Sequence, residues 1–309
     1  MIVTSVTVRV PAKINLQLAV GPLRPDGYHG LVTVFHAIGL FDMITVAAAE
    51  ADSVAVTGEG AGQVPADDDN LALRAVRALR AVAPAQAGPG VAVTINKRIP
   101  VAAGLAGGSA DAAAALVACN ELWRAGLSQR ELCDIAAGVG SDVAFAVLGG
   151  TAVGRGRGER LTPALMPPAR YHWVLAFADG ALSTPEVYGT LDRLRAADGA
   201  AGETAEPELS TELMAALRAG DLERLGRSLS NDLQAPAMSL FPALRKTLEA
   251  GREFGALGAL VSGSGPTCFF LTRDVRQATD LAVALSGAGV CRTVTRASGP
   301  VPGATVIER

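Results

Sequence analysis

The amino-acid sequence predicts an α+β fold divided into two domains. Three observations support this prediction: the chain has 309 residues, strand patterns precede helical patterns in its first half, and the pattern changes at a proline-rich stretch near residue 160. Strands and helices that are grouped rather than strictly alternating are typical of antiparallel sheets covered by helices. We expect an N-terminal domain over residues 1–161 and a C-terminal domain over residues 162–309.

Strands dominate the first domain. Residues Val3–Val10 alternate between apolar and polar side chains with a period of two, which is typical of a half-buried strand. A second strand follows Pro11, and two more are expected on either side of a short turn at Phe41–Asp42. The predicted strands are Val3–Val10, Ile14–Val20, Leu31–Leu40, Ile44–Ala49 and Val91–Asn96.

Three helices complete the first domain. Residues Leu71–Ala83 have apolar residues at helical spacing, and Asp69–Asn70 precede them as candidate N-caps. A glycine-rich segment leads into a second helix, Ser109–Trp123. The third helix begins at Ser128, because Ser128–Glu131 has the pattern of a capping box.

The second domain is expected to begin after Thr162–Arg170, whose prolines predict a turn or linker. Residues 185–252 are mostly helical, with a polar loop at Asp198–Glu208. The strands and the helix that follow have an order typical of antiparallel pairing. The predicted strands are His172–Ala178, Ala259–Ser262, Thr267–Leu271 and Arg292–Ala297, and the late helix is Asp274–Leu285.

The composition excludes several classes of protein. Half of the residues are hydrophobic and 18% are charged, so the chain can form a core and is not disordered. The net charge of -3 leaves no basic excess for a nucleic acid. No apolar run reaches the roughly 18 residues of a membrane helix, and the N-terminus lacks the pattern of a signal peptide. We expect a cytoplasmic protein with no nucleic-acid partner and no membrane partner.

Cysteines and histidines give no metal-site pattern. The four cysteines lack CxxC spacing, which is typical of reduced, mostly buried thiols, and the three histidines lack the spacing of metal ligands.

Lysine is rare in this chain. The basic residues comprise 24 arginines and only three lysines, Lys13, Lys97 and Lys246. An ammonium and a guanidinium are not interchangeable at a tight site, so each lysine is a candidate functional residue.

The strongest functional signal is Pro100–Asp111, where small residues lead into an alanine-rich helix. Glycines let the backbone approach a ligand closely, and the free N–H groups at a helix start attract anions. Ser109 would cap the helix or donate to a phosphate. The segment has neither the lysine of a Walker A loop nor a GxGxxG pattern. We interpret it as a phosphate-binding loop; the alternative is an ordinary loop with a tight helix contact.

Two further segments contain charged candidates. Lys13 and Asn15 point the same way if Pro11–Asn15 is a strand, and a partly buried lysine needs an anionic partner. The alternative is a surface lysine on an edge strand. Asp142 precedes an apolar run, and its alternative role is to cap a helix.

Two loops are also candidates. Arg24–His29 contains a Pro-Asp-Gly turn followed by Tyr28 and His29, an aromatic face and an imidazole suited to a planar ligand. The alternative is simple turn chemistry. Ser262–Thr267 is a second glycine-rich loop, which is either a hairpin turn or another wall of an anion pocket.

Together these segments resemble the three motifs of the GHMP kinase superfamily. The superfamily has a Pro-x-Lys-x-Asn strand, a central Pro-x-x-x-Gly-Leu-x-x-Gly-Ser loop and a late Gly-x-Gly loop, which correspond here to Pro11–Asn15, Pro100–Ser109 and Gly263–Gly265. The resemblance implies a two-domain GHMP kinase fold. Its N-terminal domain, which binds ATP, would be ribosomal protein S5 domain 2-like, and its C-terminal domain would be ferredoxin-like α/β.

A narrower resemblance concerns the substrate. Asp26–His29, together with Asp69–Leu71 and Gly140–Val143, is similar to the branch that acts in the non-mevalonate (MEP) route to isoprenoid precursors. This implies a small-molecule kinase in which ATP, with Mg²⁺ bridging its phosphates, phosphorylates the 2-hydroxyl of a cytidine-diphosphate-linked methylerythritol. We expect a monomer or a weak homodimer.

The resemblance implies that Asp142 and Lys13 are the catalytic residues. An alcohol is a poor nucleophile at neutral pH, so a carboxylate beside it acts as a general base. An ammonium beside that carboxylate keeps it ionised and offsets charge on the transferred phosphoryl group.

The binding residues also follow from the resemblance. Tyr28 and Tyr188 would sandwich the cytosine ring, His29 would hydrogen-bond its edge, and Asn15 would contact the methylerythritol part. The remaining substrate-binding residues would be Thr184, Gly263, Ser264 and Gly265. The ATP-binding residues would be Asn70, Lys97, Pro100, Val101, Ala102, Ala103, Gly104, Leu105, Ala106, Gly107, Gly108, Ser109 and Ala110.

The central loop departs from the superfamily pattern at three positions. Ala103 and Ala106 replace glycines, which is harmless only if their φ angles stay negative. Asp111 would bring a negative charge towards the phosphates unless it faces away or helps hold Mg²⁺.

Three rival functions remain open on the sequence alone. A homoserine or mevalonate-type kinase would have no base to stack on Tyr28. A catalytically silent nucleotide sensor would be expected to lack Lys13 or Asp142, and both are present. An RNA-binding protein would need a basic surface.

Overall fold

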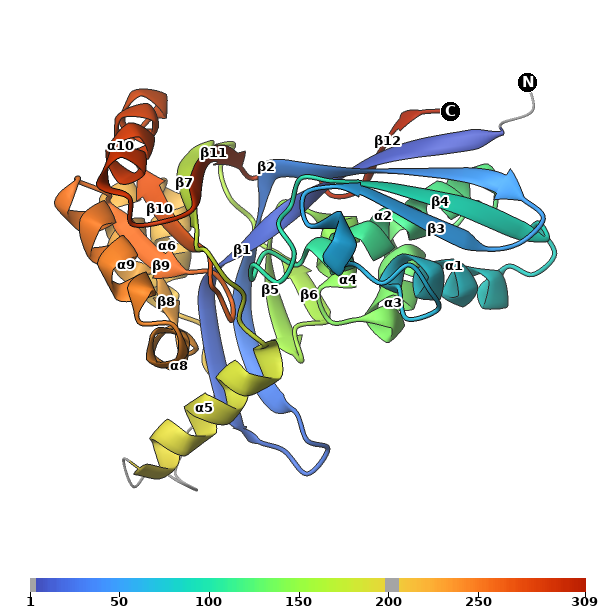
Figure 1. Ribbon diagram of the computed structural model, residues 1–309. Coiled ribbons are helices and arrows are strands. Elements are labelled where there is room, and N and C mark those ends of the chain that lie inside the picture. Colours follow the sequence, from blue (N-terminus) through green and yellow to red (C-terminus); the bar gives the residue numbers. More distant parts are fainter. Residues whose placement is uncertain (1–3, 198–205) are drawn as a thin grey trace.

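The computed structural model describes residues 4–197 and 206–309, in which two β-sheets each carry their own helices (Figure 1). In these residues the first sheet has eight strands, with β12-β1-β2-β4-β3 as its main order, β5 and β6 beside β2, and β8 beside β1. The second sheet has four strands in the order β11-β7-β10-β9, all antiparallel. The predicted two-domain α+β fold is confirmed.

The first sheet and its helices lie to the right in Figure 1, apart from the short β8, which is labelled on the left. Its strands are β1 (Ser5–Leu23), β2 (His29–Ala49), β3 (Ser53–Gly58), β4 (Gly90–Lys97), β5 (Thr151–Gly156), β6 (Arg160–Pro163), β8 (Ser230–Asn231) and β12 (Thr305–Glu308). Its helices are α1 (Leu71–Val82), α2 (Gly107–Leu122), α3 (Gln129–Val139) and α4 (Val143–Leu148), and a 3-10 turn spans Ala61–Gln63.

The second sheet and its helices lie to the left. Its strands are β7 (Tyr171–Phe177), β9 (Gly258–Val261), β10 (Cys268–Thr272) and β11 (Thr293–Gly299). Its helices are α5 (Thr184–Ala197), α6 (Thr211–Ala219), α7 (Leu222–Ser228), α8 (Gln234–Leu240), α9 (Ala243–Glu253) and α10 (Val275–Ala288). Most of the loop predicted at 198–208 lies outside the described residues.

The strands β1 and β2 form one long hairpin, so the prediction of four separate strands was wrong. Pro11 pairs with Phe41 while Ala12 pairs with Ile38, which places a bulge where a strand end and a turn were predicted. A bulge bends a strand without ending it. The hairpin therefore continues beyond the bulge, where β5 pairs with β2 and β8 with β1, and it ends beside α5 (Figure 1).

Five strands of the first sheet were not predicted: β3, β5, β6, β8 and β12. The strand β6 pairs with β5 up to Pro163, and β12 returns from the end of the chain to pair with β1. The domain division at residues 161 and 162 stays a prediction, to which the structure adds that β8 and β12 belong to the first sheet.

The helix α2 packs in the centre of the first domain against β1 and β2. Its buried residues are mostly alanine, including Ala112, Ala113 and Ala114, and such small side chains let the helix approach the sheet closely. The sheet contributes Val6, Val8 and other buried residues on the face predicted from the period-two pattern.

The helix ends test the predicted caps. The side chain of Asn70 accepts a hydrogen bond from Ala72 N, and Ser128 forms the predicted capping box with Glu131. The helix α2, however, begins at Gly107 and has Ala106 at its N-cap without any side-chain cap bond. The idea that Ser109 caps this helix was therefore wrong, because Ser109 lies within the first turn.

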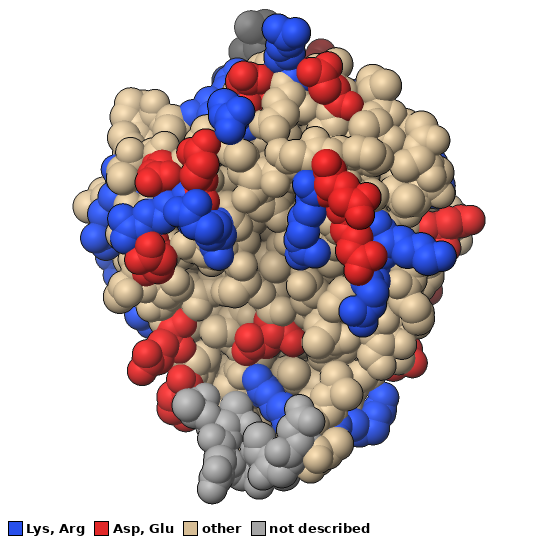
Figure 2. Space-filling view, turned by 90° about the vertical axis from the view of Figure 1, so that its left-hand side faces the viewer, with Lys and Arg blue, Asp and Glu red and all other residues tan. Residues whose placement is uncertain are grey.

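Surface and cysteine features agree with the sequence analysis. On the face shown in Figure 2, Lys and Arg lie interspersed with Asp and Glu rather than in a basic stripe. All four cysteines are free, and burial raises the pKa of the Cys133 thiol to about 11. Among the described residues, no helix has the length and apolar character needed to cross a membrane.

Candidate active site

Lys13 and Asp142 come together at the start of α4. Lys13 Nζ lies 3.5 Å from Asp142 Oδ2, and the lysine side chain is 9% exposed against 29% for the aspartate. Asp142 makes no side-chain cap bond to α4, although it stands at the N-cap position. The surface-lysine and helix-cap alternatives were therefore wrong, and the carboxylate is available to a ligand.

A second contact orients the ammonium. Lys13 Nζ donates to Asn15 Oδ1 at 2.8 Å, which confirms that the two side chains share one face of β1. Asn15 Nδ2 donates to Thr33 Oγ1, and that hydroxyl donates to the Gln17 carbonyl. These bonds fix the amide of Asn15 with its oxygen towards Lys13. Sequence reasoning missed Thr33, which stands on the neighbouring strand.

The glycine-rich loop between β4 and α2 closes the site on one side. Lys13 N donates to the Leu105 carbonyl at 3.2 Å, so the loop lies directly against β1. In the part of the chain that the structure describes, the N–H groups of Gly107, Gly108 and Ser109 have no acceptor. Free N–H groups at a helix start, together with the helix dipole, form an anion site.

The late glycine-rich loop packs against both features. A Cβ on Gly263 would lie 3.3 Å from Lys13 Nζ and 3.3 Å from Asn15 Oδ1. Ser262 Oγ donates to the Gly104 carbonyl at 3.0 Å, and a Cβ on Gly104 would lie only 2.1 Å from Ser262 O. This loop therefore joins the phosphate loop to the second sheet, and the simple hairpin-turn reading was incomplete.

The alanines of the central loop differ in conformation. Ala106 has a φ of 58° and Ala102 a φ of 52°, both left-handed, whereas Ala103 is not among the positive-φ residues. A left-handed alanine costs roughly 1–2 kcal/mol. The departure at Ala103 is therefore harmless to the backbone, and the departure at Ala106 is strained.

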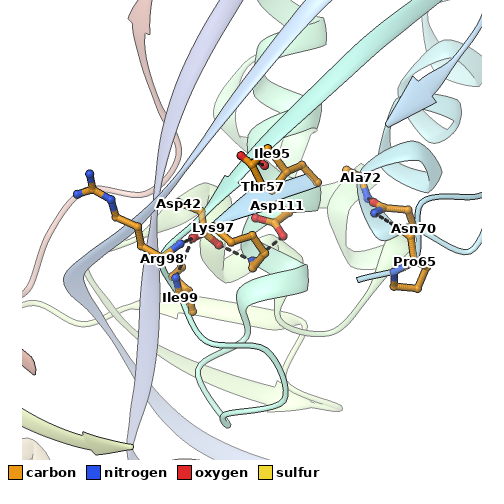
Figure 3. Close-up of polar contacts among 10 residues, drawn as sticks. All are labelled: Asp42, Thr57, Pro65, Asn70, Ala72, Ile95, Lys97, Arg98, Ile99 and Asp111. Atoms are coloured by element: carbon orange, nitrogen blue, oxygen red, sulfur yellow. Dashed lines mark hydrogen bonds and ion pairs between the residues drawn. The ribbon is translucent and has the colours of Figure 1, made fainter. Parts of the chain in front are cut away.

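Lys97 lies in a buried ionic cluster. Its Nζ is 2.5 Å from Asp42 Oδ2 and 2.7 Å from Asp111 Oδ2, and none of these three side chains is more than 3% exposed (Figure 3). Asp42 Oδ1 also accepts the N–H groups of Arg98 and Ile99. Asp111 thus faces Lys97 inside the domain, which resolves the two alternatives for it: it faces away from the loop.

The charged groups of this cluster shift one another's pKa values. Burial alone would lower the pKa of Lys97, but the two carboxylates outweigh burial and raise it. Burial raises the pKa of Asp111 to about 7 despite the opposing attraction of Lys97. Asp111 Oδ1 is buried without a hydrogen-bond partner, which agrees with a carboxyl that binds a proton easily.

Asn70 also uses its side chain locally. Its Oδ1 accepts from Ala72 N and its Nδ2 donates to the Pro65 carbonyl (Figure 3). The contacts of Asn70 and Lys97 with adenosine stay predictions, because both polar side chains are engaged inside the protein.

A second cluster lies where the β1–β2 hairpin meets α5. His29 Nε2 is 2.9 Å from Asp192 Oδ1, and the rings of His29 and Tyr188 are 5.2 Å apart at an interplanar angle of 31°. Burial, followed by the nearby carboxylates of Asp142 and Asp232, raises the pKa of Tyr188. This aromatic therefore lies close to the Asp142 carboxylate.

Tyr28 occupies a different environment. It is 53% exposed at the end of the hairpin, and the Arg157 guanidinium lies 5.0 Å from its ring centre. Thr184, at the start of α5, hydrogen-bonds Ser264 of the late loop at 2.9 Å. The structure thus links Thr184 and Ser264 directly, while Tyr28 remains open to solvent.

Several contributing residues were not predicted: Thr33, Asp42, Asp192 and Asn231. Asn231 Nδ2 donates to the carbonyls of Val261 and Gly263, and so supports the late loop. Only Asp192 had a usable sequence signal, because it follows Tyr188 by four residues on a helix and therefore shares its face.

The described residues contain no group of three or more His, Cys, Asp or Glu side chains that could hold a metal ion. Mg²⁺ that binds with a nucleotide needs only one or two protein oxygens, because phosphates and waters supply the rest. The Asp142 carboxylate and the Ser109 hydroxyl suit this need.

Sequence comparisons agree with these features. The model of the GHMP kinases N terminal domain matches residues 70–150, and that of the GHMP kinases C terminal matches residues 213–291. The 4-diphosphocytidyl-2-C-methyl-D-erythritol kinase of Thermobifida fusca (strain YX) is 54% identical, over 98% of this chain and 99% of the relative. The enzyme of the same name from Mycolicibacterium smegmatis is 56% identical, over 98% and 92%.

Comparison with solved structures distinguishes proteins that share only the fold from proteins of the same family. A crystal structure of 4-(cytidine 5'-diphospho)-2C-methyl-D-erythritol kinase has a TM-score of 0.74 at 34% identity, covering 94% of this chain and 98% of its own. A homoserine kinase from Cytophaga hutchinsonii has a TM-score of 0.76 at 20% identity, covering 99% and 98%, which shows only a shared fold. Since identity, unlike shape, distinguishes these relatives and extends over both sheets, the chain belongs to the GHMP kinases and, within them, to the family of the 4-diphosphocytidyl-2-C-methyl-D-erythritol kinases.

Proposed function

We propose that this kinase uses ATP to phosphorylate the 2-hydroxyl of 4-(cytidine 5'-diphospho)-2-C-methyl-D-erythritol. The observation that carries the proposal is the Lys13–Asp142 pair, at 3.5 Å, between an anion-binding loop and a pair of aromatic rings. This arrangement suits a substrate that has a hydroxyl at one end and a planar base at the other.

Asp142 acts as the general base. Its carboxylate accepts the proton of the substrate hydroxyl as the oxygen attacks the γ-phosphorus of ATP, and ADP leaves. A positioned base contributes about 10²–10⁴-fold to such a reaction. Asp142 is suited to this role because it is partly exposed and makes no helix-cap bond.

Lys13 supplies positive charge without moving. The hydrogen bond to Asn15 holds its ammonium beside both Asp142 and the late loop. From there it offsets negative charge on the transferred phosphoryl group.

The central loop holds the phosphates of ATP. The free N–H groups of Gly107, Gly108 and Ser109 would donate to phosphate oxygens. Mg²⁺ would be held by the phosphates with the Ser109 hydroxyl or the Asp142 carboxylate, and it would neutralise charge on the β- and γ-phosphates. The adenosine would lie towards Asn70 and Lys97, with main-chain rather than side-chain contacts.

The substrate occupies the other side of the Lys13–Asp142 pair. Tyr28 and Tyr188 would enclose the cytosine, His29 would hydrogen-bond its edge, and Asn15 would contact the methylerythritol. The loop Gly263–Gly265 and Thr184 would close the site. This division between ATP and substrate is supported by the position of the catalytic pair between the two clusters.

A coupled kinase assay tests the proposal. The purified chain is offered ATP and Mg²⁺ with the cytidine-linked substrate, with mevalonate or with homoserine. We expect turnover with the cytidine-linked substrate at a kcat/KM at least 10²-fold above the others. Equal or greater turnover of homoserine or mevalonate would contradict the proposal, and both fall within the reach of this fold.

The base-binding side is tested separately. Tyr28→Ala should raise the KM for the cytidine-linked substrate and leave the KM for ATP nearly unchanged. Equal increases in both values would place Tyr28 elsewhere. Sedimentation of the purified chain tests the proposed monomer or weak homodimer, and fractionation of its native cells tests the proposed cytoplasmic location.

A further inference from the structure

Asp192 has no role in the function proposed above, although it contacts His29, which that function places at the edge of the cytosine. His29 begins β2, and its side chain is only 5% exposed. Asp192 stands on α5, one helical turn after Tyr188, and its Oδ1 lies 2.9 Å from His29 Nε2. The same helix therefore carries both the ring that lies against His29 and the carboxylate that bonds it.

This contact determines where the ring proton lies. A carboxylate can only accept a hydrogen bond, so His29 Nε2 must carry the proton that it donates to Asp192. In a neutral imidazole the other nitrogen, Nδ1, is then an acceptor. No group in the described part of the chain donates to Nδ1.

A further contact fixes the helix against the hairpin. Arg195, three residues after Asp192, donates to the carbonyls of Val20 and Gly21 on β1. The hydrogen bond between Asp192 and His29 thus links two segments that are already held together. The packing of α5 against the hairpin does not depend on this one bond.

We propose that Asp192 is a positioning residue that holds His29 in the Nε2–H tautomer, so that Nδ1 accepts a hydrogen bond from the exocyclic amino group of cytosine and the site discriminates against uracil. The inference rests on the proposed function, because it concerns the base of that substrate. Cytosine presents an N–H donor where uracil presents a carbonyl oxygen. An acceptor fixed at Nδ1 forms a hydrogen bond with the amino group of cytosine and repels the carbonyl oxygen of uracil.

The size of the effect follows from the cost of an unpaired polar group. Facing two acceptors against each other in a partly buried site costs about 1–3 kcal/mol, which is roughly 5- to 150-fold in kcat/KM. Without Asp192 the ring can take either tautomer or rotate. The ratio of kcat/KM for the cytidine-linked substrate to kcat/KM for the uridine-linked analogue should then fall towards one.

The kinetic test compares two substrates and two variants. Asp192→Ala is assayed with the cytidine-linked substrate and with its uridine-linked analogue, at saturating ATP. Glu186→Ala is the matched control, because it removes an exposed acid from the same helix. We expect the ratio of kcat/KM values for the two substrates to fall at least tenfold in Asp192→Ala, through KM, and to stay unchanged in Glu186→Ala.

A spectroscopic measurement reads the tautomer without turnover. The chain has only three histidines, so ¹⁵N-histidine spectra can be assigned with one substitution each. At alkaline pH, wild-type His29 should show a protonated Nε2 and an unprotonated Nδ1, and Asp192→Ala should show a mixture.

The outcomes distinguish a failure of the proposed kinase function from a failure of the proposed role of Asp192. Failure of the wild type to use the cytidine-linked substrate would overturn the proposed function, whatever the histidine spectra show. Normal turnover with an unchanged substrate ratio in Asp192→Ala, or an unchanged His29 tautomer, would overturn the role of Asp192. Asp192→Asn, whose amide can still accept from Nε2, should restore part of the ratio.

Discussion

Two lysines of the first domain face aspartates, and their surroundings differ. Lys13 lies 3.5 Å from one carboxylate that is 29% exposed, and it shares its charge with the amide of Asn15. Lys97 lies within 2.7 Å of two carboxylates that are almost completely buried. The Lys13–Asp142 pair is partly exposed, so each of its charged groups can form new contacts with a substrate. The buried cluster around Lys97 cannot, because its charged groups are enclosed and already paired.

The comparison shows why lysine rarity alone was a poor guide. The sequence singled out both residues, and both ammonium groups lie near glycines of the site: a Cβ on Gly263 would lie 3.3 Å from Lys13 Nζ, and a Cβ on Gly107 would lie 3.2 Å from Lys97 Nζ. They differ in that the Lys97 ammonium is already paired with two buried carboxylates. Lys97 holds together β2, β4 and α2, the helix into which the central glycine-rich loop leads. Lys246, the third lysine, is exposed on α9, as expected of a surface charge.

The first way to test this contrast is to remove the base. Asp142→Asn should lower kcat by about 10²–10⁴-fold with little change in KM, because the amide cannot accept the substrate proton. Steady-state kinetics measure the effect. Asp134→Asn, an exposed acid on α3, is the control and should keep wild-type kcat. Near-normal turnover in Asp142→Asn would end the assignment of Asp142 as base.

Removing the buried charge should act on folding instead. Lys97→Met leaves Asp42 and Asp111 without their cation and should lower the free energy of unfolding by about 3–5 kcal/mol. Urea unfolding followed by circular dichroism measures this loss. Adding Asp42→Asn and Asp111→Asn should recover part of it. Lys246→Met should change stability by less than about 0.5 kcal/mol, and an equal loss there would remove the contrast.

Changing the shape of the catalytic charge should have a smaller effect. Lys13→Arg keeps the positive charge but replaces a compact ammonium by a wide planar group, in a space bounded by Asn15 and Gly263. We expect kcat to fall about tenfold or more while the urea midpoint changes little. A kcat close to wild type would show that charge alone is needed.

The protonation of Asp111 gives a dependence of stability on pH. Its folded pKa of about 7 lies above the unfolded value of 3.8, so the folded state binds more protons than the unfolded state between these values. This contribution therefore stabilises the fold at low pH and is lost as pH rises towards 7. Asp111→Asn, which cannot titrate, should gain stability relative to wild type over this range.

Urea titrations from pH 4 to pH 8 measure that difference. Glu121→Gln on the same helix is the control, since Glu121 is partly exposed and pairs with Arg309 at the surface. A difference between Asp111→Asn and wild type that does not change with pH would show that Asp111 is ionised in the folded state throughout.

The smallest effect is expected at the strained loop. Ala106→Gly should raise the free energy of unfolding by up to about 1 kcal/mol, because glycine accepts a φ of 58° without strain. Ala103→Gly should instead lower stability by about 0.5–1 kcal/mol, since it only adds freedom to the unfolded chain. Thermal unfolding measures the stability change of each variant. If both substitutions changed stability in the same direction, the proposed difference in backbone strain between Ala106 and Ala103 would be contradicted.

The local parts of the site could be predicted from the sequence. The period of a strand places Lys13 and Asn15 on one side of β1, and small residues before a helix give the phosphate loop its free N–H groups. The cap at Asn70 and the capping box at Ser128 depend only on neighbouring residues, and both are present.

What depends on pairing between distant segments could not be predicted. The bulge opposite Pro11 exists because β1 and β2 are paired along their whole length, and nothing in either segment alone requires it. Lys97 meets Asp42 across 55 residues of sequence, so its role became clear only from the fold. The left-handed φ of Ala106 likewise reflects its position in the loop and not its residue type.

The return of β12 to the first sheet has a mechanical consequence. In the described residues the chain leaves the first sheet after β6, returns to it at β8 between β7 and β9, and returns again at β12 after β11. The second sheet is therefore tied to the first at the start, in the middle and at the end of its sequence. A body tied at several points swings less freely about any one of them, so we expect the late loop to keep its place beside Lys13.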